Sequence, residues 1–164
     1  SDGGKYRHFS ASAFGGVKAK IRTHVALPEL SHSPPLWRRV WLTEGELKAD
    51  ISCLRLGEPV LGISGVTAWR VKDILKQLRK LGAREVIIAF DADLRRNPQV
   101  RRQRNRLALE LLRSGLEVKI GIWDEMMGKG LDDLLIAGWY PEVKPHLQGR
   151  DGHPFTRHQD APQL

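Results

Sequence analysis

The stretch Val86-Ile87-Ile88-Ala89-Phe90-Asp91-Ala92-Asp93 is the part of this chain that best predicts its fold. Its five consecutive apolar residues are typical of a central strand that is covered on both faces of a parallel sheet. Two aspartates follow this strand directly. Because ligands of open parallel sheets bind beyond the carboxyl ends of the strands, we expect both carboxylates to lie at a functional edge.

Short apolar runs and helical patterns alternate on both sides of this strand. Four such alternations predict the α/β class: a Rossmann-like, three-layer α/β/α arrangement with a four-stranded, mainly parallel sheet and right-handed crossovers. A glycine follows the second and the third helical pattern, as is common at helix C-termini. The other predicted strands cover residues 40–43, 59–63 and 118–123, and the predicted helices contain Leu47, Ile51 and Leu54, then Val71, Ile74, Leu75, Leu78 and Leu81 before Gly82, and then residues 98–113 before Gly115.

The length of 164 residues and the 41% share of hydrophobic residues fit one globular domain. Composition divides the chain into an N-terminal arm or remnant of a preceding domain (residues 1–36), a catalytic domain (37–140) and a flexible C-terminal tail (141–164). No apolar stretch reaches the roughly 18 residues of a membrane helix, and no secretion signal is visible, so we expect a cytoplasmic protein without membrane contact. The single cysteine, Cys53, excludes an internal disulfide.

Acidic residues follow three of the four predicted strands. Glu44-Gly45 comes after the first, Asp91 and Asp93 after the third, and an acidic group that includes Asp132 after the fourth. Carboxylates gathered at one edge repel each other unless a cation neutralises them, and oxygen ligands without nearby Cys or His suit Mg²⁺ or Mn²⁺. Taken singly, Glu44 could instead cap a helix and Asp93 a turn. Their joint occurrence at strand ends favours a metal site for phosphoryl transfer.

These residues resemble the TOPRIM domain family over residues 37 to about 139, roughly two thirds of the chain. The family's core motifs are a Glu-Gly after the first strand and an Asp-x-Asp after the third. Two strings are most similar to toprim-like domains of phage, plasmid and integrative-element replication proteins, many of them primase-helicase fusions. They are Thr43-Glu44-Gly45-Glu46-Leu47-Lys48-Ala49-Asp50 and Lys129-Gly130-Leu131-Asp132-Asp133.

The resemblance implies a toprim fold with the four strands in the order 2-1-3-4. It implies that Glu44 is the general acid or base and also belongs to the metal site, where Asp91 and Asp93 hold Mg²⁺ with Asp132 as a further acidic contributor. One position departs from the pattern, because many relatives have an acid four residues after the glutamate, where this chain has Lys48. Asp50 is the alternative acid.

Basic residues predict a polyanionic partner. The formal net charge is +8, and residues 94–119 contain eight basic residues and only two acidic ones. Helical spacing places Val100, Leu107 and Leu111 on one side of the third helix and three arginines on the other, as either a solvated face or a ridge that follows phosphates. The arginines of this ridge are Arg102, Arg106 and Arg113; Arg95, Arg96 and Lys129 are further candidates for phosphate contacts.

Aromatic and histidine residues add less. The five tryptophans are mostly expected in the core, and Trp69 is the candidate for base stacking. All six histidines fall in the predicted arm or tail, so we assign them no metal.

The sequence therefore predicts Mg²⁺-dependent nucleotidyl or phosphoryl transfer on DNA or RNA, as the toprim domain of a mobile-element DNA primase-type replication protein. Nucleotides are expected as ligands, and a helicase or another replication module is expected in a longer parent chain. Two alternatives remain open: a toprim-family nuclease that uses the same acids, and a non-catalytic domain that binds nucleic acid and recruits partners. The tyrosines, Tyr6 and Tyr140, lie at the margins of the domain and argue against a topoisomerase.

Overall fold

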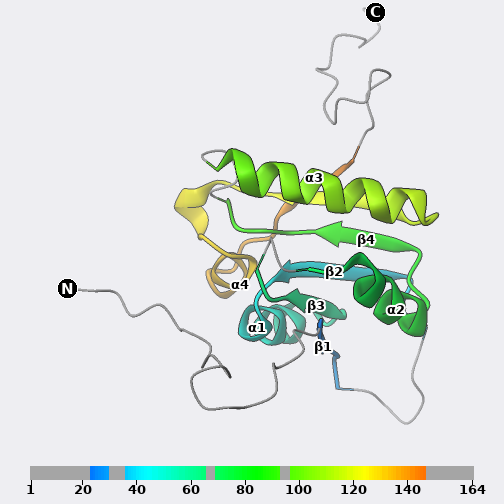
Figure 1. Cartoon of the computed structure of the whole chain (residues 1–164). Coiled ribbons are helices and arrows are strands. Elements are labelled where there is room, and N and C mark those ends of the chain that lie inside the picture. Colours follow the sequence, from blue (N-terminus) through cyan, green and yellow to red (C-terminus); the bar gives the residue numbers. More distant parts are fainter. Residues whose placement is uncertain (1–22, 30–35, 66–68, 93–96, 147–164) are drawn as a thin grey trace, which may run out of the picture.

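Strand β4 (Glu85–Ile88) lies in the middle of a six-stranded sheet in the computed structural model of the chain, which describes residues 23–29, 36–65, 69–92 and 97–146. Its neighbours are β2 (Arg39–Glu44) and β5 (Glu117–Ile122), and β2 also pairs with β3 (Val60–Ile63). All three pairings are parallel, and the arrows of β2, β3 and β4 run the same way in Figure 1. The order β3-β2-β4-β5 is the order predicted for the four strands.

The sheet is larger than predicted, because an antiparallel strand is added at each edge. Residues 24–26 and 142–145, expected to belong to an irregular arm and tail, are instead strands β1 (His24–Ala26) and β6 (Glu142–Pro145). They pair with β3 and β5 respectively. Both are short, and β6 carries charged residues and a proline, as edge strands commonly do. Residues 1–22 and 147–164 lie outside the described part of the chain.

Helices α2 (Val71–Leu81) and α3 (Pro98–Arg113) cover one face of the sheet, where their buried leucines pack against side chains of β2 and β4. Helix α2 ends at Gly82, whose φ of 75° is left-handed, as the sequence predicted for a glycine at this position. Helix α3 begins after Asn97, whose side chain accepts hydrogen bonds from the backbone N–H groups of the first turn. No helix in the described residues is long and apolar enough to cross a membrane.

Helices α1 (Glu46–Leu56) and α4 (Leu131–Ile136) lie side by side over the other face (Figure 1). The buried face of α1 consists of small residues, Ala49, Ser52 and Cys53, while Leu47 and Leu54 are 72% and 83% exposed. The helical spacing of those leucines therefore predicts the helix but not its buried side. A short 3₁₀ turn (Glu125–Met127) precedes α4.

Candidate active site at the carboxyl edge of the sheet

Glu44 is the last residue of β2 and is half-buried at the carboxyl edge of the sheet. The chain turns directly after it at Gly45, which has a φ of 82°, a conformation that other residues rarely adopt. The Gly45 N–H donates to the Ile63 carbonyl of β3 at 2.8 Å, and the Gly45 carbonyl accepts from Ala49 N–H at 3.3 Å. These bonds fix where α1 starts relative to the end of β2.

Asp91 follows β4 at the same edge and is buried. Its Oδ1 accepts a hydrogen bond from Lys48 Nζ of α1 at 2.6 Å. In this ion pair the side chain of Asp91 is 11% exposed and that of Lys48 is 29% exposed. The next residue, Ala92, donates its N–H to the Lys129 carbonyl at 2.8 Å. This bond ties the loop after β4 to the loop that leads into α4.

Asp132 lies in the first turn of α4, against the same lysine. A β-carbon at Gly130 would collide with Asp132 Oδ1 and lie 3.0 Å from Lys48 Nζ, so both side chains pack on this glycine. Among the described residues, the buried Oδ1 of Asp132 has no hydrogen-bond partner. A carboxylate oxygen in that state fits a cation ligand, because carboxylates are hard oxygen donors that Mg²⁺ and Mn²⁺ accept.

The electrostatics of Lys48 connect all three carboxylates. Burial lowers the pKa of Lys48, but the hydrogen bond to Asp91 and the negative charges of Asp91, Asp132 and Glu44 outweigh burial, so that its pKa is raised. Burial and the charge of Asp133 raise the pKa of Asp132, and Lys48 opposes this shift. The ammonium of Lys48 therefore lies within the field of Glu44, Asp91 and Asp132.

The structure brings some of the predicted site residues together and leaves others untested. Asp91 pairs with Lys48, Asp132 lies beside the same lysine at Gly130, and Glu44 adds to the negative charge that acts on Lys48. Asp93, Arg95 and Arg96 lie outside the described residues. The side chain of Lys129 is exposed, and its backbone carbonyl holds the Asp91 loop. The described residues do not include Asp93. Among them, no group of three or more His, Cys, Asp or Glu is arranged to hold a metal ion. The Mg²⁺ site therefore stays a prediction.

The arginines predicted to form a ridge on α3, Arg102, Arg106 and Arg113, are all exposed, and Leu107 and Leu111 are buried on the opposite side of the helix. Arg113 pairs with Glu110 at 3.2 Å. Arg106 lies over the ring of Trp69, 5.6 Å from its centroid. This cation–π contact occupies one face of the tryptophan that was the candidate for base stacking.

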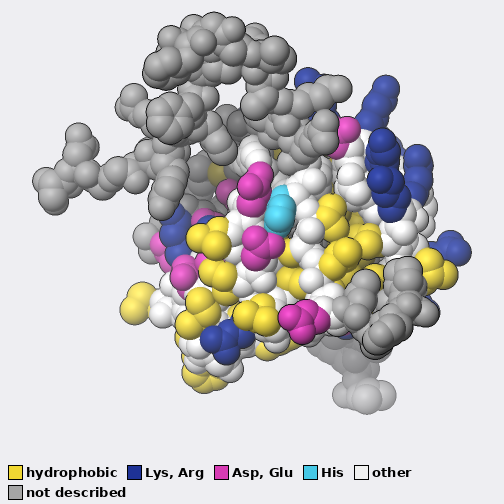
Figure 2. All heavy atoms as spheres, turned by 90° about the horizontal axis from the view of Figure 1, so that it is seen from below, with side chains coloured by type: hydrophobic (Ala, Val, Ile, Leu, Met, Phe, Trp, Pro, Cys, Tyr) yellow, Lys and Arg dark blue, Asp and Glu magenta, His cyan; other side chains and the backbone are white. Residues whose placement is uncertain are grey.

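Sequence reasoning missed two features of the charged surface. It treated Lys48 only as a departure from a family pattern, although the position of this residue in the first turn of a helix after Glu44-Gly45 points back to the strand ends. It also overlooked the lysines of α2, whose spacing of four residues was a readable signal. Figure 2 shows Lys and Arg side chains gathered toward one border of the face seen there. The lysines of α2 are Lys72, Lys76 and Lys80, all of them exposed.

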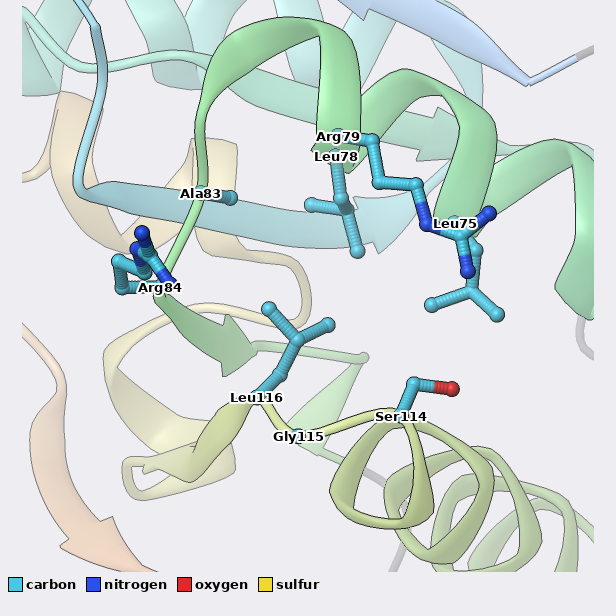
Figure 3. A pocket seen from close by; sticks show the side chains of 8 residues that line it. All are labelled: Leu75, Leu78, Arg79, Ala83, Arg84, Ser114, Gly115 and Leu116. Atoms are coloured by element: carbon cyan, nitrogen blue, oxygen red, sulfur yellow. The ribbon is translucent and has the colours of Figure 1, made fainter.

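A cavity of about 180 Å³ lies at the opposite edge of the sheet, between the ends of α2 and α3 (Figure 3). Its lining includes Arg84 and Leu116, which precede strands β4 and β5. None of the predicted site residues takes part in it.

The chain was compared with known protein families. The model of a family described as "Domain of unknown function (DUF3854)" matches residues 37–139, a span that contains Glu44, Lys48, Asp91 and Asp132. No curated protein matches the chain.

Proposed function

We infer the function of this chain, which belongs to the DUF3854 family, a domain of unknown function, from the geometry of its carboxyl edge. We propose that it is a toprim-type catalytic domain, with a Rossmann-like core of four parallel strands, that performs Mg²⁺- or Mn²⁺-dependent nucleotidyl or phosphoryl transfer on nucleic acid. The role we propose is that of the toprim domain of a mobile-element DNA primase-type replication protein. The observation that carries the proposal is that Glu44 and Asp91 lie at the carboxyl ends of two neighbouring parallel strands, with Asp91 and Asp132 both beside Lys48.

The sheet topology supports this proposal. The chain passes from β3 at one side of β2 to β4 at the other, so the strand order reverses between β2 and β4. Ligands of open α/β sheets bind at such a reversal, beyond the carboxyl ends of the strands. Glu44 ends β2 and Asp91 comes after β4, at the edge where a substrate would be expected.

Each residue has a proposed role. Glu44 acts as the general acid or base, and Asp91, Asp93 and Asp132 are the ligands of the divalent ion. When bound, that ion would stabilise the negative charge that builds up on the attacking and leaving oxygens of the phosphate. Lys129, together with Arg95 and Arg96, would contact phosphate oxygens, and the arginine ridge of α3 would follow the nucleic acid backbone.

The proposal includes partners and location. DNA or RNA and nucleotides are the ligands that an acidic metal site beside basic helices would bind. A helicase or another replication module would act in the same parent chain, in the cytoplasm.

The test measures chemistry directly. The purified chain is incubated with single-stranded templates, labelled nucleotides and labelled strands, in Mg²⁺, in Mn²⁺ and in chelator. We expect metal-dependent nucleotide incorporation, which Glu44→Gln abolishes and Glu46→Gln, the same change at an exposed neighbour, leaves intact. Strand cleavage with the same dependence on Glu44 would favour the nuclease. Nucleic acid binding without either reaction would favour the recruitment domain, and full activity in Glu44→Gln would contradict the catalytic assignment.

A further inference from the structure

The carboxyl edge of the sheet, called the acidic edge below because Glu44 and Asp91 lie there, already contains a cation. Lys48 Nζ lies 2.6 Å from Asp91 Oδ1. At that distance the ammonium is in direct contact with a carboxylate that the proposed function gives to a metal ion.

The backbone holds this lysine in place. The hydrogen bonds of Gly45 set the start of α1, and Lys48 follows within the first turn. On the other side, Lys48 Nζ and Asp132 Oδ1 both lie against Gly130, where a β-carbon would displace one of them. Lys48 is thus confined between the end of β4 and the start of α4.

An ammonium group and a divalent ion would compete for the same carboxylate, Asp91. Mg²⁺ binds carboxylate oxygens at about 2.0–2.1 Å and holds its other ligands in a near-octahedral shell. The two oxygens of Asp91 can accept more than one partner, but a divalent ion bound there would lie close to the Lys48 ammonium, and the two positive charges would repel each other in a partly buried site. Lys48 in its present position therefore opposes metal binding at Asp91, and binding is favoured when the ammonium moves away.

We propose, on the basis of the proposed function, that Lys48 is an internal competitor of the divalent metal ion at Asp91 and that it lowers the metal affinity of the site. The residue acts as a positioning residue in the metal-free protein, where it holds Asp91 and neutralises the acidic edge. The partly exposed Lys48 side chain leaves a path by which the ammonium can swing toward solvent.

Calorimetric titration with Mn²⁺ tests this proposal in the whole chain. We expect Lys48→Met and Lys48→Gln to bind Mn²⁺ about tenfold more tightly than the parent, since neither has to displace a cation. Lys119→Met is the matched control, because Lys119 also pairs with a buried carboxylate of the β4 segment, Glu85, at 2.6 Å, but at the opposite edge of the sheet. It should bind Mn²⁺ like the parent.

A second measurement uses the unmodified protein and does not depend on how the variants fold. Lysine acylation is followed residue by residue by mass spectrometry, with and without Mn²⁺. Displacement of the ammonium should make Lys48 several-fold more reactive in Mn²⁺, while Lys119 stays unchanged and serves as the internal reference.

The outcomes separate the two proposals. Suppose that the parent binds Mn²⁺. If the Lys48 variants then bind it equally or more weakly, or if Mn²⁺ does not change the reactivity of Lys48, the competition is refuted and the metal site stands. If no variant and no parent binds Mn²⁺, the metal-dependent function fails together with the competition.

Discussion

At the scale of single residues, two lysines make the same contact at opposite ends of one strand. Lys119 pairs with Glu85, the first residue of β4, and Lys48 pairs with Asp91, which follows the strand. Glu85 has a second cation, Arg39. Burial raises the pKa of Glu85, but its hydrogen bonds to Lys119 and Arg39 outweigh burial, so its pKa is lowered. The Glu85 carboxylate is thus paired with two cations. Near Lys48, by contrast, the buried Asp132 Oδ1 has no hydrogen-bond partner among the described residues.

The buried His146 makes stability sensitive to pH. Burial lowers the pKa of His146, and the positive charge of Arg104 lowers it further. A histidine with a depressed pKa adds stability above its unfolded-state value of about 6.5 and loses this contribution as the pH falls through its folded-state value. We expect the free energy of unfolding of the parent to fall as the pH is lowered from 7 toward 5, and His146→Phe to flatten this slope. Urea denaturation across this range, with pH 8 as the reference, measures it; an equal slope in the variant would exclude His146.

The glycine at position 62 keeps the turn after Glu44 in place. A β-carbon there would lie 2.6 Å from the backbone oxygen of Gly45 and 3.1 Å from the β-carbon of Ala49. Because backbone cannot swing aside, we expect Gly62→Ala to destabilise the chain by about 1–3 kcal/mol in chemical denaturation. Gly130→Ala is the comparison, since its close contacts are the ends of the Asp132 and Lys48 side chains. A smaller cost at Gly62 than at Gly130 would contradict this packing.

At the scale of elements, strong local signals were enough to predict several bounds. Helix α3 covers the predicted residues 98–113 because a capping asparagine precedes it and a glycine follows its end. The end of β2 at Glu44 was predictable in the same way, since the apolar run stops there, whereas β4 ends at Ile88, before the predicted end at Phe90. The contact of Lys48 with Asp91 was not, because it depends on the register of a helix against a strand 43 positions away. Edge strands β1 and β6 also gain their structure from pairing rather than from local pattern.

Helix α1 shows why apolar spacing alone misassigns a buried face. The helix approaches β3 so closely that only small residues fit between them, and Leu47 and Leu54 point to the surface. We expect the double variant Leu47→Gln, Leu54→Gln to keep its unfolding free energy within about 0.5 kcal/mol of the parent. Ala49→Leu on the same helix should cost about 1–3 kcal/mol through overpacking. Thermal and urea unfolding measure the loss of stability in both variants. A larger loss in the double leucine variant than in Ala49→Leu would mean that the leucines form the buried side.

At the scale of the whole molecule, basic side chains are concentrated on the helices that cover one face of the sheet. Both α2 and α3 belong to that face, and Arg106 of α3 contacts Trp69, which comes just before α2. Acidic side chains gather instead at the carboxyl edge. Two sets of three exposed cations can therefore be compared: the α3 set, Arg102, Arg106 and Arg113, and the α2 set, Lys72, Lys76 and Lys80.

Replacing either set with glutamine separates a specific nucleic acid path from the effect of net charge. Each variant loses three positive charges from a formal net charge of +8, so general electrostatic attraction should fall equally in both. If the α3 set binds phosphates, the slope of log affinity against log salt should fall in the α3 variant by roughly one for each phosphate that is no longer neutralised, and change much less in the α2 variant. Fluorescence anisotropy with labelled single strands and duplexes over a range of salt concentrations measures both slopes. Equal slopes in the two variants would assign binding to the charge of the whole molecule. A larger decrease of the slope in the α2 variant would indicate that the nucleic acid binds along α2 instead.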